Sequence, residues 1–124
     1  MDKLKVLYVD DDPDIREIAI MSLGLDPDMD VRGEGSGAEA LLAARSWQPN
    51  AILLDVMMPS MDGPTTLRHL RECAETAAIP VIFITARAQT REVDEYLAMG
   101  ALAVIVKPFD PMTLAKSVRS HVTS

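Results

Sequence analysis

Short apolar runs alternate along the chain with segments in which apolar residues recur every three or four positions. The runs have the length and the Val, Ile and Leu content of β-strands. The intervening segments have the periodicity of amphipathic helices. Five such pairs follow one another without a linker or a low-complexity segment. The predicted strands are Leu4–Val9, Met29–Gly33, Ala51–Asp55, Val81–Thr85 and Ala103–Val106.

Residues that start and stop helices stand between these runs. Asp12-Pro13 places a capping acid before a proline at the first helical position. Asp110-Pro111 repeats this arrangement and predicts the start of the last helix. The other boundaries are marked by a capping-box pair, prolines and glycines, namely Ser36 with Glu39, Pro49-Asn50, Pro64, Gly24 and Gly100.

The helical spacing also predicts which side chains face the sheet. One face of each helix collects the apolar positions, and that face is expected to be buried. These positions are Ile15, Ile18, Ala19, Ser22 and Leu23 in the first helix, Ala38, Leu41 and Leu42 in the second, Leu67 and Leu70 in the third, Val93, Tyr96 and Leu97 in the fourth, and Leu114 and Val118 in the fifth.

The strands are apolar at nearly every position, which is typical of parallel strands covered on both faces. Right-handed crossovers then give a doubly wound, flavodoxin-like α/β fold, in which five helices cover both faces of a five-stranded parallel sheet. We expect residues 1–124 to form a single domain. In the strand order 2-1-3-4-5 the order reverses between the first and third strands, where such folds bind ligands.

Composition excludes several classes of function. The 124 residues carry a formal net charge of −7, which disfavours direct nucleic-acid binding by this domain. No apolar stretch is long enough for a membrane span, and no apolar leader follows the N-terminus. Cys73 is the single cysteine, so an internal disulfide is impossible and a cytoplasmic location is expected.

Five polar residues stand at the carboxyl ends of the predicted strands: Asp10 and Asp11, Asp55, Thr85 and Lys107. Because parallel strands end at the same edge of a sheet, these side chains are expected to converge. Three carboxylates that lie close together repel one another unless a cation intervenes. Mg2+ is the natural partner, because it prefers a few carboxylates, waters and a phosphate oxygen.

The same residues suit phosphoryl transfer. The Asp55 carboxylate can act as a nucleophile toward phosphorus and form an aspartyl phosphate. Lys107 could pair with the incoming phosphoryl oxygens, and the hydroxyl of Thr85 could donate a hydrogen bond to one of them. With a metal ion they would neutralise the charge that develops in the transition state.

Sequence motifs over almost the whole chain resemble the receiver (response-regulator) domain of two-component signalling, as in the CheY-like proteins. The match runs in order and with fitting spacings, and as a set the motifs are specific. They are Val9-Asp10-Asp11, Leu54-Asp55-Val56-Met57-Met58-Pro59, Met61-Asp62-Gly63, Ile84-Thr85-Ala86 and Lys107-Pro108-Phe109.

The resemblance implies a role for each residue of the site. Asp55 would accept the phosphoryl group, with Thr85 moving toward that group and Lys107 forming an ion pair with it. Asp11 would bind Mg2+ directly and Asp10 mainly through water, and the backbone carbonyl of Met57 would complete the protein ligands. The resemblance also implies a cis peptide bond between Lys107 and Pro108.

The resemblance further implies the partners. The phosphoryl donor would be a phosphohistidine on a histidine kinase or a histidine phosphotransfer protein. The output would be a protein target on the surface formed by the fourth helix, fifth strand and fifth helix, where Tyr96 is a candidate contact. The chain would be a signalling domain that catalyses only its own phosphorylation and dephosphorylation, not an enzyme with external substrates.

One position departs from the family pattern, and two others stand where the family varies the lifetime of the phosphoryl group. Val104 stands where the family usually has an aromatic ring, three residues before Lys107. The ring is part of the usual description of the switch, so its coupling is open here. Met57 and Arg87 lie two residues after Asp55 and Thr85. The resemblance implies that these two positions tune how readily water reaches the acyl phosphate. A thioether cannot orient water, so slow self-dephosphorylation is expected.

Three alternatives stay open. An aspartyl phosphatase of the haloacid-dehalogenase type would need a second acid two residues after Asp55, but Met57 occupies that position. A flavodoxin-like cofactor binder would need a glycine- or hydroxyl-rich loop where this chain has three consecutive acids. A pseudo-receiver would act only as an interaction scaffold. Whether the chain acts alone or as the N-terminal part of a longer regulator is not decided by its sequence.

Overall fold

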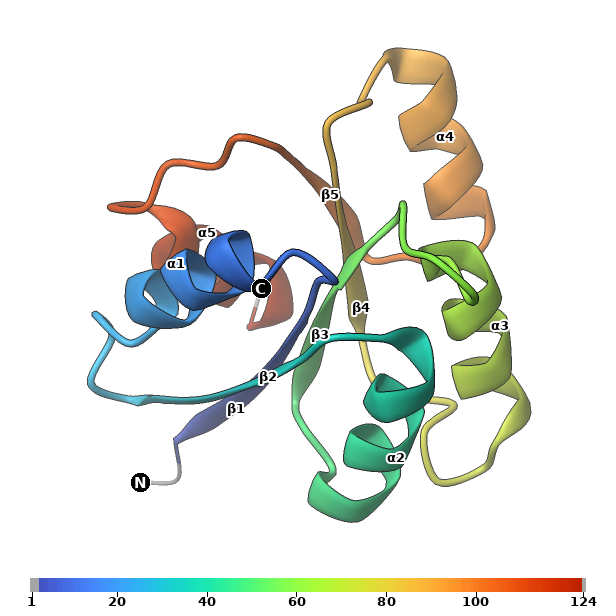
Figure 1. Cartoon of the computed structure of the whole chain (residues 1–124), viewed down its shortest axis with the longest axis horizontal. Helices are drawn as coiled ribbons and strands as arrows, with labels where there is room; N and C mark the ends of the chain where they lie inside the picture. Colours follow the sequence, from blue (N-terminus) through green and yellow to red (C-terminus); the bar gives the residue numbers. More distant parts are fainter. Residues whose placement is uncertain (1–2, 124) are drawn as a thin grey trace.

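The computed structural model describes residues 3–123 and has five strands in one sheet, with five helices around it (Figure 1). All strand pairs are parallel, and the strand order is β2-β1-β3-β4-β5. The predicted doubly wound architecture and strand order are therefore confirmed. The strands are β1 (Leu4–Val9), β2 (Met29–Glu34), β3 (Ala51–Asp55), β4 (Val81–Thr85) and β5 (Ala103–Val106).

The predicted strand bounds agree with the structure at every strand except β2. This strand runs one residue further, to Glu34, which pairs with Val9 of β1. The carbonyl of Glu34 also accepts a hydrogen bond of 3.1 Å from the amide of Asp10. The extension therefore holds the residue that follows β1 at the sheet edge.

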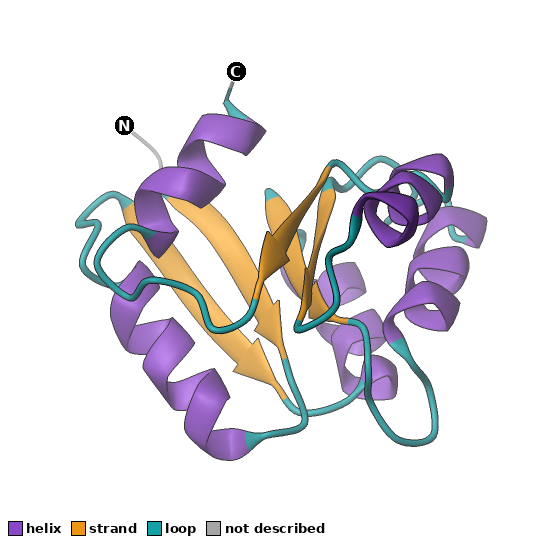
Figure 2. Cartoon of the chain, turned by 90° about the horizontal axis from the view of Figure 1, so that it is seen from above, coloured by secondary structure: helices purple, strands orange, loops and turns teal. Residues whose placement is uncertain are grey.

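The helices form one layer on each face of the sheet, as Figures 1 and 2 show. On one face α1 (Pro13–Leu23) and α5 (Leu114–Val122) cover a core cluster that includes Tyr8, Leu53 and Ile84. On the other face lie α2 (Gly37–Trp47), α3 (Gly63–Glu72) and α4 (Thr90–Ala98), over a cluster that includes Leu54 and Phe83. Every residue of β3 and β4 is buried, as expected for strands covered on both sides.

Side-chain caps set the starts of three helices. The carboxylate of Asp12 accepts hydrogen bonds from the amides of Asp14 and Ile15, as the Asp-Pro signal predicts. Ser36 caps α2 by accepting from the amide of Glu39, which confirms the capping-box pair. Asp62 caps α3, so this helix begins at Gly63, one residue before the proline from which its start was predicted.

The start of α5 was predicted too early. Asp110 does not cap this helix, which begins at Leu114. Its side chain accepts a hydrogen bond of 2.9 Å from the amide of Met112, and its carbonyl accepts from the amides of Thr113 and Leu114. The Asp-Pro pair therefore forms a turn that leads into the helix.

Some predicted inner faces were also wrong in detail. Ile18 in α1 is 49% exposed and Leu42 in α2 is 65% exposed, and Ala38 is exposed as well. The buried residues of α2 are Gly37, Ala40 and Ala44, and of these Ala40 and Ala44 belong to the core cluster on this face of the sheet. In α4 no residue is buried, and Val93 and Tyr96 are only partly covered while Leu97 is exposed. Among residues 3–123, no helix has the length and apolar character needed to cross a membrane.

Candidate functional site

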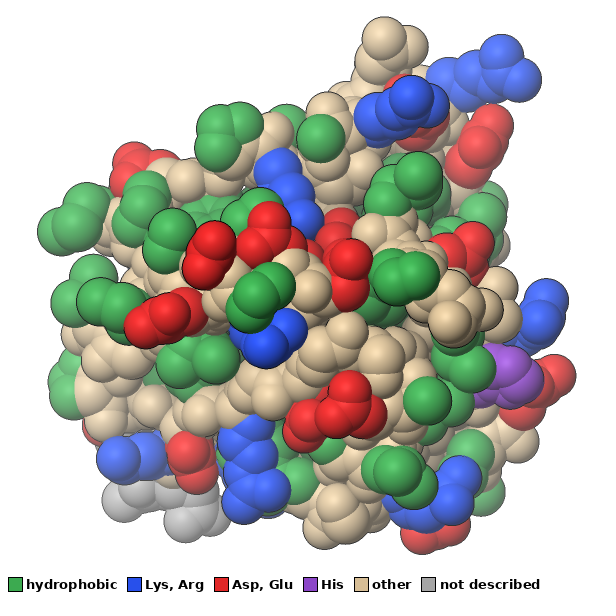
Figure 3. Space-filling view, in the orientation of Figure 1, with side chains coloured by type: hydrophobic (Ala, Val, Ile, Leu, Met, Phe, Trp, Pro, Cys, Tyr) green, Lys and Arg blue, Asp and Glu red, His purple; other side chains and the backbone are tan. Residues whose placement is uncertain are grey.

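The five polar residues singled out in the sequence meet at the carboxyl edge of the sheet. Asp10 follows β1, Asp55 ends β3, Thr85 ends β4 and Lys107 follows β5. Together with Asp11 they line one hollow of about 330 Å³. Figure 3 shows acidic side chains gathered in the middle of this face, with hydrophobic side chains around them. The other residues that line the hollow are Asp12, Ile15, Met57, Ala86 and Arg87.

Lys107 reaches the two buried carboxylates of the site. Its Nζ lies 2.9 Å from Oδ2 of Asp10 and 3.3 Å from Oδ2 of Asp55. Burial alone would lower the pKa of the Lys107 ammonium, but its hydrogen bond to Asp10 and the charges of both carboxylates raise that pKa overall. The ammonium is therefore positively charged and shared between two acids.

Asp10 is fully buried and accepts hydrogen bonds from three groups. Its Oδ1 accepts from the amide of Asp12 at 3.0 Å, and its Oδ2 accepts from Lys107 and from the hydroxyl of Tyr8 at 3.1 Å. Burying a polar group is costly unless it is hydrogen-bonded, and these three donors meet that need. Asp10 is thus held in one orientation by groups from β1, the following loop and the residue after β5.

The environment of Asp55 disfavours its negative charge. The residue is 5% exposed. Burial, and next the charge of Asp10, raise the pKa of Asp55 from its ordinary value of 3.8 to about 6, although Lys107 opposes the change. The carboxylate is still mostly ionised at pH 7, but its negative charge is incompletely compensated.

Asp11 differs from these two acids because it is exposed on the rim of the hollow. One carboxylate oxygen from each of Asp10, Asp11 and Asp55 lies within 4.8 Å of the other two. Hard oxygen donors at this spacing, with an uncompensated charge beneath them, fit a divalent cation such as Mg2+. The three acids that the sequence predicted to converge therefore lie together at this edge.

Thr85 lies at the edge of the same hollow. Its side chain is buried, and its Oγ1 accepts a hydrogen bond of 3.0 Å from the amide of Arg87. Its carbonyl accepts from the amide of Lys107 at 2.8 Å, so the ends of β4 and β5 are tied together beside the site. The peptide bond between Lys107 and Pro108 is cis, as the family resemblance implied.

The two methionines after Asp55 have different environments. Met57 is 73% exposed and lines the acidic hollow, whereas Met58 is 8% exposed and belongs to the core on the α2–α3 face.

Val104 is partly buried and packs against that core, as Tyr96 does. The ring of Tyr96 lies edge-on to Phe83, with ring centroids 5.1 Å apart.

The close approach of α3 to β3 requires glycine at position 63, the first residue of that helix. A Cβ atom built there would lie 2.6 Å from the carbonyl oxygen of Asp55 and 2.9 Å from the Cα of Val56. The amide of Gly63 donates a hydrogen bond of 2.9 Å to the carbonyl of Val56. The start of α3 is therefore packed directly against the backbone that carries Asp55.

Two residues of the site were missed in the sequence. Tyr8 was counted only as a strand residue, although its place two positions before Asp10 puts both side chains on one face of the sheet. Arg16 was assigned no role, although its Nη1 donates a hydrogen bond of 2.7 Å to the carbonyl of Asp10. The signal that could have identified them is a side chain able to donate a hydrogen bond two positions before a site acid or six positions after it.

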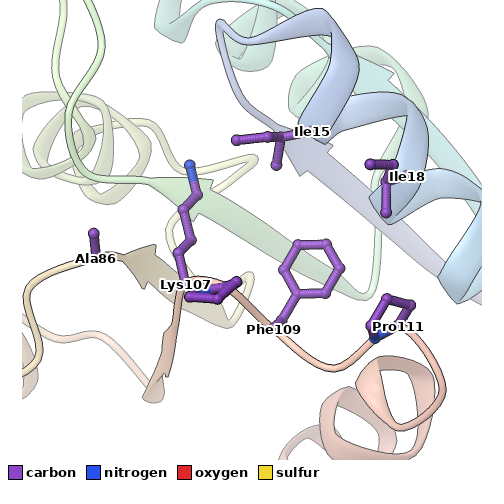
Figure 4. A pocket seen from close by; sticks show the side chains of 7 residues that line it. Ile15, Ile18, Ala86, Lys107, Phe109 and Pro111 are labelled. Atoms are coloured by element: carbon purple, nitrogen blue, oxygen red, sulfur yellow. The ribbon is translucent and has the colours of Figure 1, made fainter.

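An apolar hollow of about 380 Å³ adjoins the acidic one. Figure 4 shows Ile15 and Ile18 of α1 facing Phe109 and Pro111 across it. The two hollows share Ile15, Ala86 and Lys107. A molecule seated in the apolar hollow would therefore stand beside the acidic site.

Comparison with known proteins gives a consistent result. A family model described as the response regulator receiver domain matches residues 6–119. The chain is 37% identical over 119 residues to the DNA-binding response regulator MtrA of Mycolicibacterium smegmatis, covering 95% of this chain and 50% of that protein. It is 34% identical to the transcriptional regulator RpaA of Synechocystis sp., covering 94% of this chain and 48% of that protein. The chain thus spans about half the length of the curated relatives it matches.

Solved structures agree with this match. The chemotaxis protein CheY4 of Vibrio cholerae superposes with a TM-score of 0.86 at 32% identity, covering 95% of this chain and 98% of that one. The receiver domain of the Francisella response regulator 1452 gives a TM-score of 0.87 at 29% identity, covering 98% of both chains. With the fold, the acidic edge and a family match over residues 6–119 in agreement, the chain belongs to the response regulator receiver domains of two-component systems.

Proposed function

We propose that Asp55 is the phosphoacceptor of a phosphorelay and receives its phosphoryl group from a phosphohistidine on a histidine kinase or phosphotransfer protein. The observation that carries the proposal is the placement of Asp55 beside Lys107, 3.3 Å from its ammonium, in a hollow lined by two further acids. The family match supports the same reading, because receiver domains are signalling domains.

Mg2+ fits the acidic hollow as the cofactor of this step. Asp11, Asp55 and the backbone carbonyl of Met57 would hold it directly, and Asp10 would hold it mainly through water. Asp10 suits the indirect role because three protein donors already occupy its oxygens. When bound, the ion supplies positive charge next to the oxygens of the transferring phosphoryl group.

The residues of the chain divide the chemistry among them. An oxygen of the Asp55 carboxylate attacks phosphorus, so that an oxygen–phosphorus bond forms, the phosphorus–nitrogen bond to the donor imidazole breaks, and the imidazole leaves with the electron pair. Lys107 then pairs with a phosphoryl oxygen, and Thr85 donates a hydrogen bond to another. A pKa of about 6 keeps Asp55 ionised and nucleophilic at neutral pH.

The proposed output is a change at the surface formed by α4, β5 and α5. Exposed apolar side chains occur in α4 and β5, namely Leu97 at 42% and Val106 at 51% exposed, and Leu102 between these elements is 43% exposed. Since Val104 has no ring, movement of Thr85 would reach this surface through the following loop and α4. Support comes from the contact of Tyr96 in α4 with Phe83, which lies two residues before Thr85.

The alternatives are less well supported. The position two residues after Asp55, where a phosphatase of the haloacid-dehalogenase type needs an acid, carries the exposed Met57. A cofactor phosphate at the end of β1 would meet Asp10, Asp11 and Asp12 instead of a glycine-rich loop. A domain that acts only as an interaction scaffold does not require Lys107 to be shared between two buried acids at the edge of the sheet.

The relatives suggest a context for this domain. MtrA and RpaA are described as a DNA-binding response regulator and a transcriptional regulator, and this chain matches about half of each. We infer that the chain passes its signal to a protein target or to an attached output segment, and that it does so in the cytoplasm, where response regulators act. The 124 residues carry a net charge of −7, which disfavours direct contact with the phosphate backbone of nucleic acid.

Incubation with acetyl phosphate and Mg2+ tests the proposal. Wild-type protein is expected to gain the mass of one phosphoryl group, and Asp55→Asn, its isosteric control, is not. The adduct should be lost in hydroxylamine, as an acyl phosphate is. Phosphoryl transfer at another residue, or steady phosphate release from an external ester, would contradict it.

A further inference from the structure

The hydroxyl of Tyr8 is the least expected feature near the site. The residue is fully buried in the core cluster between the sheet and helices α1 and α5. The other buried members of that cluster are apolar and have no hydrogen-bond donor in their side chains: Val6, Ala19, Leu23, Met29, Leu53, Ile82, Ile84, Ala103, Leu114 and Val118. A buried hydroxyl costs free energy unless it is hydrogen-bonded, so a phenylalanine would be the simpler residue for packing alone.

Among the residues that the structure describes, the hydrogen-bond partner of this hydroxyl is Asp10, which belongs to the site. It donates to Oδ2 of Asp10 over 3.1 Å. The same oxygen accepts from Nζ of Lys107 over 2.9 Å. Oδ2 therefore has two donors of different kinds, a fixed phenol within the core and a flexible ammonium at the surface of the hollow.

The two donors differ in what phosphorylation does to them. Lys107 lies between Asp10 and Asp55, and the proposed function moves it toward the phosphoryl oxygens on Asp55. Tyr8 cannot follow, because its ring is enclosed on all sides. When Lys107 turns away, Tyr8 is the side-chain donor that stays on the buried oxygen of Asp10.

We infer that Tyr8 is a positioning residue for phosphorylation: its hydroxyl holds Asp10 in place and keeps that carboxylate hydrogen-bonded while Lys107 is transferred to the phosphoryl group. The inference rests on the proposed function. In the free protein Lys107 can serve Oδ2 alone, so loss of the hydroxyl matters little. In the phosphorylated form the loss leaves a charged oxygen without its remaining side-chain donor, which is the costlier situation.

The test compares Tyr8→Phe with wild type in two measurements. Calorimetric titration with beryllofluoride and Mg2+, which mimic the phosphoryl group, gives the affinity of the loaded state. Urea unfolding in EDTA gives the stability of the free state. We expect Tyr8→Phe to bind beryllofluoride about tenfold more weakly, because a hydrogen bond to a charged acceptor is lost mainly in the loaded state. Its stability in EDTA should stay close to that of wild type.

A control variant separates positioning from packing. Ile82→Val removes one methylene group from the same cluster without approaching Asp10. It should lower stability equally with and without ligand and leave the affinity for beryllofluoride unchanged. Equal affinity of Tyr8→Phe and wild type for beryllofluoride would overturn the inference. Failure of wild type to bind, or binding by Asp55→Ala as tight as that of wild type, would instead contradict the proposed function.

A second measurement needs no variant. A phenol proton that is buried and bonded to a carboxylate exchanges slowly and resonates downfield in proton NMR. The Tyr8 hydroxyl is expected to give such a signal in free wild-type protein and to retain it, further downfield, after beryllofluoride and Mg2+ are added. Disappearance of the signal on loading would show that Tyr8 does not hold Asp10 in the phosphorylated form.

Discussion

Replacing Asp55 by asparagine is expected to stabilise the metal-free protein at neutral pH. The side chain keeps its size, but its uncompensated charge is removed from a site that is 5% exposed. The pKa of Asp55 rises from 3.8 to about 6 on folding, mainly through burial and then through Asp10. At about 1.36 kcal/mol per pH unit, this rise corresponds to at most about 3 kcal/mol of stability lost at pH 7.

The sign of the pH dependence follows from the direction of that change. Because the folded pKa is the higher one, the folded protein binds the proton more tightly than the unfolded chain. The penalty is therefore complete above about pH 6, shrinks as the pH falls from 6 to 3.8, and vanishes below that range. Asp55→Asn has no such carboxyl group, so its advantage over wild type should disappear between pH 7 and pH 4.

Urea unfolding in EDTA at several pH values measures the effect, with both proteins in the same buffers. Taking the difference between the two proteins cancels the titration of the other acids. Asp14→Asn, an exposed acid in the first turn of α1, serves as a control for the loss of one negative charge. A stability difference near zero at pH 7, or one that grows as the pH falls, would refute this account of Asp55.

Three further predictions concern the surroundings of the site. Gly63→Ala should lower the free energy of unfolding by about 3 kcal/mol, measured by urea denaturation, because its Cβ would press on the Asp55 carbonyl at 2.6 Å; a change below about 0.5 kcal/mol would contradict this. Met57→Asn should shorten the half-life of the phosphorylated protein, followed by mass spectrometry, because an amide can orient water where the thioether cannot. Asp12→Ala should cost about 1 kcal/mol of stability through loss of the α1 cap, with the exposed Glu17→Ala as a neutral control.

The sheet and the acidic edge could be predicted because a few strong rules govern them. A strand covered on both faces must be apolar at nearly every position, and a surface strand or an amphipathic helix seldom has that pattern. Once the strands are parallel, geometry alone brings their carboxyl ends together, and the residues Asp10, Asp55, Thr85 and Lys107 must meet. No packing detail was needed for this conclusion.

Helix faces and the start of α5 were less predictable, since they depend on packing and on hydrogen bonds between competing groups. In α2 alanine and leucine occur on both faces, so the periodicity did not show that Ala40 and Ala44, not Ala38 and Leu42, face the sheet. An aspartate before a proline can cap a helix or form a turn. At Asp110 its side chain accepts from the amide of Met112, which favours the turn.

The electrostatics of the site connect its stability with its function. Two buried acids, Asp10 and Asp55, share one ammonium, and the exposed Asp11 adds a third negative charge at the rim. The free protein therefore carries a charge imbalance that packing cannot relieve. A cation that binds here gains affinity from relieving that imbalance, and by linkage it stabilises the fold. Asparagine at position 55 would remove part of the imbalance in advance, so Mg2+ should stabilise that variant less than it stabilises wild type.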